Sequence, residues 1–171
     1  MTDVTEDWLL NEAVKIYQPV KGYRAGLDAL LLSASLPDIG IGRALEVGCG
    51  AGGALFTAAW HLKDTNFVGL ERESLMADLA RCGVEGNGFS GRVEIVEGDL
   101  QQLRDNWENA FDLVFSNLSA LNFDQNSLAL GWESKIPDNL TNLTIRYCEM
   151  SAGNAPLPNL SSTSLTNISL Q

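Results

Sequence analysis

The first 117 residues alternate between helical and strand patterns of apolar positions. Leu27, Leu30, Leu31 and Ala34 recur at intervals of three and four, which predicts a core-facing helix that ends before Pro37. Short apolar runs then predict four buried strands, and longer stretches between them predict helices. The strands are expected at 43–48, 67–71, 92–99 and 111–117, and the helices at about 54–62, 74–86 and 100–109.

This alternation predicts an α/β fold of the Rossmann-like type, a mostly parallel sheet with helices on both faces. Three parts are expected along the chain. Residues 1–37 form a segment that precedes the sheet, residues 38–117 form the Rossmann-like core, and residues 118–171 form an atypical, weakly ordered tail. Because the tail shows little strand pattern, we expect the sheet to be incomplete after its fourth strand.

Three of the predicted strands end in a polar residue. Glu71 ends the second strand, Asp99 the third and Asn117 the fourth. Open α/β sheets bind ligands outside the carboxyl ends of their strands, so these side chains are expected at one binding site.

The turn after the first strand is rich in glycine and reads Leu45-Glu46-Val47-Gly48-Cys49-Gly50-Ala51-Gly52-Gly53. Two cofactor patterns fit it. Gly48, Gly50 and Gly53 match the dinucleotide pattern G-x-G-x-x-G, whereas Glu46 with Gly48, Gly50 and Gly52 matches the E/D-x-G-x-G-x-G pattern of S-adenosylmethionine enzymes.

Glu46 favours S-adenosylmethionine over a nicotinamide dinucleotide. A dinucleotide brings a pyrophosphate to this turn, and a nearby carboxylate repels it. The methionine part of S-adenosylmethionine instead carries an ammonium and a sulfonium centre, which a carboxylate attracts. Glu71 suits the ribose hydroxyls of either cofactor, and Asp99 is placed to accept a hydrogen bond from an adenine amino group. An NAD-dependent oxidoreductase is therefore the weakest of the alternatives.

Composition and charge narrow the function further. The net charge of −11 and the pI near 4.3 argue against broad electrostatic capture of nucleic acid, although Lys15, Lys21 and Arg24 form a local basic stretch that also fits an ordinary solvated surface. The three cysteines are too few and too scattered for a disulfide framework or a zinc site, and no metal is expected. With no secretory signal and no membrane-spanning run, a cytoplasmic location is expected.

Two motifs resemble a known family, the bacterial tRNA1(Val) adenine-N6 methyltransferases, which belong to the class I S-adenosylmethionine-dependent enzymes with a small methyltransferase domain. They are Gln18-Pro19 with the run from Gly22 to Leu32, and the glycine-rich turn, within a resemblance that spans about residues 5–117. The resemblance implies S-adenosylmethionine as cofactor, tRNA or another nucleic acid as partner, and polar roles in the pocket for Arg24 and Asp28. Asp28 also fits a simpler role in the first turn of its helix.

In that family the fourth strand ends in Asn-Pro-Pro-Phe/Tyr, and the resemblance makes Asn117 the catalytic residue. The exocyclic nitrogen of adenine is a poor nucleophile because its lone pair is delocalised into the ring. An Asn oxygen and a backbone carbonyl can accept its N–H bonds and localise the lone pair, while the aromatic ring stacks on the base. This chain continues Leu118-Ser119-Ala120, without the prolines and the ring, and Phe123 and Trp132 cannot be assigned the stacking role by spacing.

Charged residues become sparse after Asn117, where Ser, Thr, Asn and Leu dominate. Within this tail only residues 139–150 show moderate strand character. We interpret the change as a shift out of register with the ancestral sequence, through a frameshift or a fusion. Three functions stay open: an active tRNA adenine methyltransferase, a degenerate protein that binds the cofactor without turnover, and a methyltransferase for a protein amide or a small amine.

Overall fold

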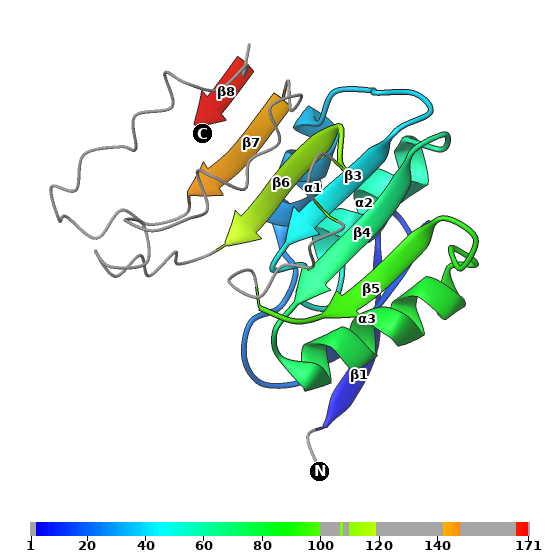
Figure 1. Cartoon of the computed structure of the whole chain (residues 1–171). Helices are drawn as coiled ribbons and strands as arrows, with labels where there is room; N and C mark the ends of the chain where they lie inside the picture. The colour runs from blue at the N-terminus through cyan, green and yellow to red at the C-terminus, as the bar shows by residue number, and fades with distance from the viewer. Residues whose placement is uncertain (1–2, 100–106, 108–109, 119–141, 148–166, 171) are drawn as a thin grey trace, which may run out of the picture.

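The computed structural model describes residues 3–99, 107, 110–118, 142–147 and 167–170, which form a hairpin, three helices and a parallel sheet (Figure 1). The strands of the sheet are β3 (Arg43–Val47), β4 (Asn66–Glu71), β5 (Val93–Glu97), β6 (Leu113–Leu118), β7 (Asn142–Tyr147) and β8 (Asn167–Leu170). They lie side by side in the order β5-β4-β3-β6-β7-β8, and every pair is parallel. The α/β, Rossmann-like fold expected from the sequence is confirmed.

The predicted elements of the core agree closely with the structure. The helices are α1 (Leu27–Ser35), α2 (Gly53–His61) and α3 (Ser74–Gly86). The last of these has the predicted bounds, and the first four strands of the sheet begin and end within about two residues of their predicted positions. The helix expected at 100–109 lies outside the described residues, apart from Trp107.

The sheet continues past its fourth strand, which corrects the expectation that it ends there. The whole length of β6 pairs with β7, and β7 pairs with β8. The strand character noted at residues 139–150 is confirmed by β7. Because β6 pairs with β3 on one side and β7 on the other, this apolar strand does not form an exposed edge that would invite aggregation. The division of the chain at residues 37 and 117 stays a prediction.

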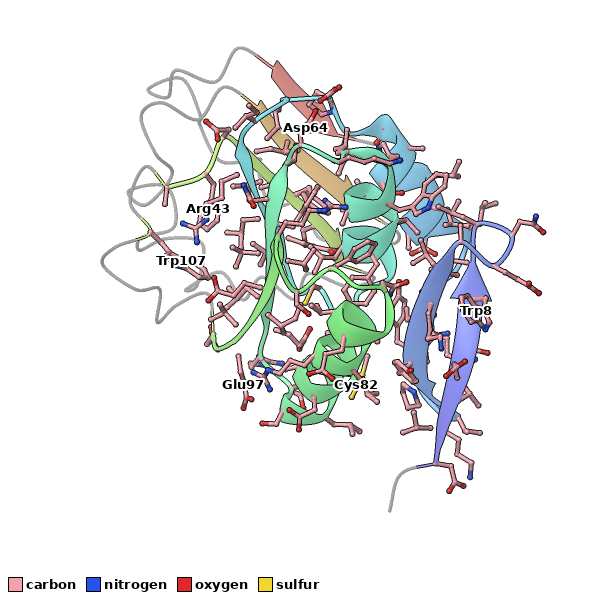
Figure 2. The ribbon with its side chains drawn as sticks, turned by 90° about the vertical axis from the view of Figure 1, so that its right-hand side faces the viewer. Trp8, Arg43, Asp64, Cys82, Glu97 and Trp107 are labelled. Carbon is pink, nitrogen blue, oxygen red and sulfur yellow. The ribbon has the colours of Figure 1, made fainter. Side chains whose placement is uncertain are left out.

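The three helices among the described residues all pack on one face of the sheet, so the expectation of helices on both faces stays a prediction for the other face. Ala44, Phe67, Leu113 and Phe115 point to the face that carries the helices and form one core with buried side chains of α1, α2 and α3. Alternate residues point to the opposite face, where Trp107 packs with Leu45, Val68, Leu70, Val96 and Phe111. Figure 2 shows Trp107 and the helices on opposite sides of the sheet.

A two-stranded antiparallel hairpin forms an outer layer beyond the helices, a feature that the sequence pattern did not predict (Figure 2). It consists of β1 (Val4–Leu9) and β2 (Val14–Pro19). Val14 and Ile16 of β2 are fully buried, and β2 packs mainly against α3. The labelled Trp8 lies on β1 with its ring half exposed, under the ammonium group of Lys15.

Asn87, just after α3, fastens the hairpin to the core. Its side-chain oxygen accepts a hydrogen bond from the Lys15 backbone N–H at 2.8 Å, and its nitrogen donates to the Lys15 carbonyl at 2.7 Å. The side chain thus satisfies both backbone groups of one residue, as a neighbouring strand would. The hairpin is therefore held in a defined position over α3.

Two glycines leave room for the ring of Phe56 between α2 and α3. Phe56 is fully buried, and a Cβ atom added to either Gly52 or Gly83 would overlap its ring. Gly52 also has a φ of 95°, which L-residues rarely adopt. Close packing of the helices therefore requires glycine at both positions.

We predict that Gly83→Ala destabilises the protein by about 1–3 kcal/mol, although alanine normally favours a helix by about 1 kcal/mol over glycine. The new methyl group must displace Phe56 from a closely packed core. Urea unfolding followed by circular dichroism measures the effect. Cys82→Ala, at the exposed neighbouring position of α3, is the matched control and should change the stability by less than about 0.5 kcal/mol. Equal stability of the Gly83 variant and the wild type would contradict the packing argument.

Candidate functional site

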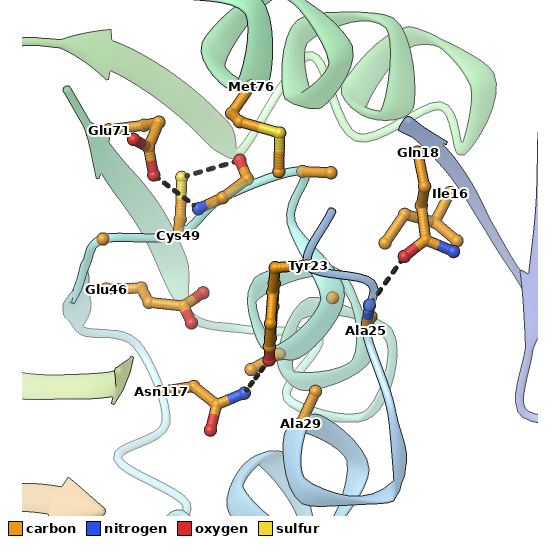
Figure 3. Close-up of a pocket in the computed structure, with 15 residues that line it drawn as sticks. Ile16, Gln18, Tyr23, Ala25, Ala29, Glu46, Cys49, Glu71, Met76 and Asn117 are labelled. Atoms are coloured by element: carbon orange, nitrogen blue, oxygen red, sulfur yellow. Dashed lines mark hydrogen bonds between the residues drawn. The ribbon is translucent and has the colours of Figure 1, made fainter. Parts of the chain in front are cut away.

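A cleft of about 230 Å³ opens at the carboxyl ends of β3, β4 and β6, where they meet the hairpin and the start of α2 (Figure 3). The register of the sheet explains why polar side chains gather here. Glu46 pairs with Gly69 on one neighbouring strand and with Phe115 on the other, so Glu71 and Asn117 each lie two residues further along. All of these positions point to the face of the sheet that carries the helices. The cleft is lined by the predicted site residues Glu46, Gly48, Gly50, Glu71 and Asn117.

Glu46 is a carboxyl group with almost no access to solvent. The residue is 1% exposed, and its Oε2 atom has no hydrogen-bond partner among the described residues. Burial raises the pKa of the Glu46 carboxyl well above its usual value; the Leu55 backbone N–H opposes this shift, and the negative charge of Glu71 adds to it. A buried carboxylate with one oxygen left without a partner is costly, so this position favours a cationic ligand in the cleft.

Glu71 is held by backbone hydrogen bonds at the end of β4. Its Oε2 atom accepts from the Gly50 N–H and its Oε1 atom from the Glu73 N–H, both at 2.8 Å. These bonds fix the carboxylate beside the glycine-rich turn and leave each oxygen with a further lone pair for a ligand hydroxyl. The geometry agrees with the predicted role of Glu71 toward a ribose.

The glycine-rich turn passes close to the cleft without side chains. Gly48, Gly50 and Gly52 have φ values of 69°, 55° and 95°. Gly48 and Gly50 line the cleft, whereas Gly52 lies behind it, where it accommodates Phe56. The predicted contact of Gly52 with the cofactor stays a prediction, and its observed role is in packing.

Several lining residues were not assigned a role from the sequence. Burial, and then the charges of Glu46 and Glu71, raise the pKa of the Cys49 thiol, so this thiol stays protonated. Gln18 was part of the family motif, but nothing in the sequence showed that β2 would bring it to the cleft. Lining residues without an assigned role include Ile16, Gln18, Tyr23, Cys49, Ala51 and Met76.

Asn117 meets Tyr23 and Asp28 at the side of the cleft nearest α1. Its Nδ2 atom donates to Asp28 Oδ2 at 2.9 Å and to the Tyr23 hydroxyl at 3.1 Å, and the hydroxyl itself donates to Asp28 Oδ2 at 3.0 Å. Burial of Asp28 would raise its pKa, but the hydrogen bonds from Asn117 and Tyr23 outweigh this and lower it. Asp28 is therefore an ionised carboxylate that contacts the predicted catalytic residue.

Arg24 is directed at the hairpin and does not line the cleft. Its guanidinium group forms an ion pair with Asp7 at 2.6 Å and donates to the Pro19 carbonyl at 2.9 Å. Gln18 donates to the same Asp7 carboxylate at 3.1 Å and accepts from the Ala25 N–H at 2.6 Å. This network fixes the segment that carries Ala25 into the cleft wall. A direct contact between Arg24 and the cofactor stays a prediction.

Two further expectations concern the edges of the site. Asp99 follows β5 and is half buried, but it is not among the residues that line the cleft, so its contact with adenine stays a prediction.

In the basic stretch, Lys15 pairs with Glu6 at 3.1 Å and Arg24 with Asp7. Acidic partners thus offset two of its three positive charges, which favours the interpretation as an ordinary surface.

Among the described residues, no group of three or more His, Cys, Asp or Glu side chains is placed to hold a metal ion. Within the same part of the chain, every helix is too short or too polar to cross a membrane.

The fold and the cleft resemble those of the class I methyltransferases. Residues 44–131 match the family model described as a methyltransferase domain, and the chain belongs to this family. The match covers about half of the chain and runs past Asn117 into the tail.

A curated relative agrees with this assignment, and two solved structures share the fold. The tRNA1(Val) (adenine(37)-N6)-methyltransferase of Yersinia pestis (strain Pestoides F) is 34% identical over 95 residues, which cover 55% of this chain and 38% of the relative. The chain therefore matches well under half the length of this relative. TYW2 from M. jannaschii, solved in complex with AdoMet, has a TM-score of 0.59 at 11% identity. The match covers 70% of this chain and 53% of the TYW2 chain. TYW2 from P. horikoshii, solved in complex with MeSAdo, has a TM-score of 0.58 at 13% identity, and the match covers 70% of this chain and 44% of that TYW2 chain.

Membership of the methyltransferase-domain family implies S-adenosylmethionine as the cofactor, and the cleft suits it. The roles of Glu46 toward the methionine ammonium group and of Glu71 toward the ribose hydroxyls stay predictions, which the unpaired Glu46 oxygen and the fixed Glu71 carboxylate support. A second buried carboxylate beside the turn would repel the pyrophosphate of a dinucleotide. When bound, S-adenosylmethionine supplies an electrophilic methyl group on its sulfonium sulfur.

We predict opposite effects of Glu46→Gln on stability and on cofactor binding. Because the folded pKa of Glu46 is raised above its unfolded value of about 4.5, the folded protein loses stability as pH rises from that value through the folded pKa. The variant lacks this loss, so its stability relative to the wild type should grow over the same pH range. Urea unfolding of the cofactor-free protein at several pH values measures this effect.

Cofactor affinity should fall in the same variant, since an ionised Glu46 attracts the ammonium group and a neutral amide does not. Calorimetric titration with S-adenosylmethionine should show binding that is roughly 10-fold to 100-fold weaker and less dependent on pH. Glu85→Gln, an exposed carboxylate on α3, is the matched control. If the variant bound S-adenosylmethionine as tightly as the wild type at every pH, the prediction that Glu46 binds the cofactor would be wrong.

Proposed function

We propose that the protein methylates an exocyclic amino nitrogen of adenine in RNA, with tRNA as the preferred substrate. The observation that carries the proposal is the place of Asn117, an amide at the carboxyl end of β6 in the same cleft as Glu46 and Glu71. The similarity to tRNA1(Val) (adenine(37)-N6)-methyltransferases, with Asn117 at the position that the family motif gives its Asn, supports RNA as the acceptor. A tRNA substrate would place the protein in the cytoplasm.

The chemistry needs a side chain that accepts a hydrogen bond from the amino group. As the amide oxygen of Asn117 accepts one N–H, the nitrogen lone pair localises and aligns with the methyl group. A nitrogen–carbon bond forms as the carbon–sulfur bond breaks, and the proton leaves to water afterwards. This scheme needs no separate general base, because the amino nitrogen becomes strongly acidic once it is methylated.

A protein amide or a small amine is the second candidate acceptor. Two observations favour it over RNA: the chain carries a net charge of −11, and Lys15 and Arg24 are engaged with carboxylates of the hairpin. Both reduce the attraction for phosphate groups. The same Asn117 chemistry serves any acceptor that presents an N–H group.

We predict that Asn117→Ala lowers methyl transfer at least about 100-fold, as expected for loss of a group that acts on the transition state. The assay incubates the protein with radiolabelled S-adenosylmethionine and unmodified tRNA transcripts. Calorimetry should show that the variant still binds the cofactor. Asn66→Ala, an exposed residue at the start of β4, is the matched control and should retain full activity.

Two outcomes would contradict the proposal. Label that enters a peptide amide or a small amine but no RNA would favour the second candidate acceptor. Transfer that persists unchanged in the Asn117 variant would show that another residue positions the amino group.

A further inference from the structure

Tyr23, Asp28 and Asn117 come from three parts of the chain and meet in one hydrogen-bonded triangle. Tyr23 precedes α1, Asp28 lies in the first turn of α1, and Asn117 lies on β6. The polar atoms of the triangle are 2.9 Å, 3.0 Å and 3.1 Å apart. Figure 3 shows Tyr23 beside Asn117, with the amide nitrogen directed at the Tyr23 hydroxyl.

The charge of Asp28 determines how the Asn117 amide is turned. The pKa of Asp28 is below its usual value, so the group is a carboxylate at neutral pH and can only accept hydrogen bonds. The end of the amide that faces it must therefore be the nitrogen. The amide oxygen is then the end that remains to accept an N–H from a substrate, as transfer to an amino group requires.

Tyr23 supplies an aromatic ring beside this amide. The residue lines the cleft and is 47% exposed, so part of its surface is open to a ligand. Its hydroxyl contacts both Asp28 and Asn117, and these contacts restrict the ring to one position. A fixed, half-exposed ring is a surface on which a flat heterocycle can stack. The sequence directly after Asn117 offers no aromatic residue for this purpose.

We propose that Tyr23 and Asn117 form a preformed subsite for a planar heterocyclic amine, and that Asp28 is the positioning residue that holds both. Tyr23 stacks on the heterocycle, and the Asn117 oxygen accepts an N–H from its amino group. The subsite thus replaces the ring that is missing after β6 with one from the segment before α1. The inference rests on the proposed N-methyl transfer and assigns the acceptor class to specific residues.

The binding test does not depend on activity. Adenosine is titrated into the full-length protein saturated with S-adenosylhomocysteine, so that the cofactor site is filled, and binding is followed by NMR. Tyr23→Leu should weaken adenosine binding roughly 5-fold to 150-fold, the range that loss of one base–aromatic stack produces. Tyr23→Phe keeps the ring and should bind within about 3-fold of the wild type.

A matched control separates the subsite from general effects of removing a ring. Trp8→Leu removes an aromatic side chain of similar exposure from the hairpin, away from the cleft, and should leave adenosine binding unchanged. If the wild type fails to bind adenosine, or if the Tyr23→Leu variant binds as well as the wild type, the proposal is overturned. Binding that depends on Tyr23 supports it, even when no RNA is methylated, and that result would count against the proposed RNA substrate alone.

The role of Asp28 has its own readout. The side-chain NH₂ signals of Asn117 can be assigned in the wild-type NMR spectrum by their loss in Asn117→Ala. In the Asp28→Ala variant these signals should shift, and their hydrogens should exchange faster with solvent than in the wild type. Single-turnover transfer to the acceptor that the wild type methylates should slow at least about 10-fold in this variant, while the affinity for S-adenosylmethionine stays within about 2-fold, because Asp28 does not line the cofactor cleft. Unchanged NH₂ signals would overturn the positioning role.

Discussion

The parallel register of β3 with its two neighbours is the constraint on which the site depends. Glu46 is level with Gly69 of β4 and Phe115 of β6, so the side chains of Glu71 and Asn117, each two residues further along its strand, fall on the same helix-bearing face as Glu46. Successive residues of a strand point to opposite faces. A slip of β4 or β6 by one residue would therefore send Glu71 or Asn117 to the wrong face. The apolar residues of the same strands, such as Phe67 and Leu113, prevent this slip because it would also remove them from the core.

The same register brings two carboxylates into a poorly solvated space, and this gives the cleft its chemical preference. Glu71 is compensated by backbone N–H groups, whereas one oxygen of Glu46 has no partner among the described residues. The site is thus left with an unsatisfied acceptor when it is empty, and a cation relieves it. Binding energy of this kind is available to a methionine ammonium group but not to a pyrophosphate. The unpaired carboxylate oxygen lowers the stability of the free protein, and a bound cation recovers that free energy.

Local patterns predicted the core of the fold well and the outer layer poorly. The bounds of α3 and the positions of β3 to β6 follow from apolar periodicity and turn residues, which act over a few positions. The hairpin was not predicted because its turn consists of Leu10, Asn11 and Glu12, each with positive φ. The Gly or Asn-Gly that usually marks a hairpin turn in a sequence is absent there. The polar residues at the strand ends likewise identified Glu71 and Asn117 as lining the cleft, but Asp99 is not among the lining residues, whereas Glu46 was identified from the glycine-rich motif. These patterns did not show that Arg24 would turn to the hairpin or that Tyr23 would reach Asn117, because those contacts join segments far apart in the sequence.

The link between Tyr23 and Asn117 spans 94 residues, and it bears on how the protein acquires its site during synthesis. The residues that favour the cofactor, Glu46 and Glu71, belong to adjacent strands joined by a single helix, so their part of the cleft can form from a local segment. The corner around Asn117 requires β6 to insert beside β3, a contact of high sequence separation that forms slowly. A nascent or partly folded chain would thus acquire its two half-sites in sequence, the cofactor side first, and would carry no competent acceptor side until the middle of the sheet had closed.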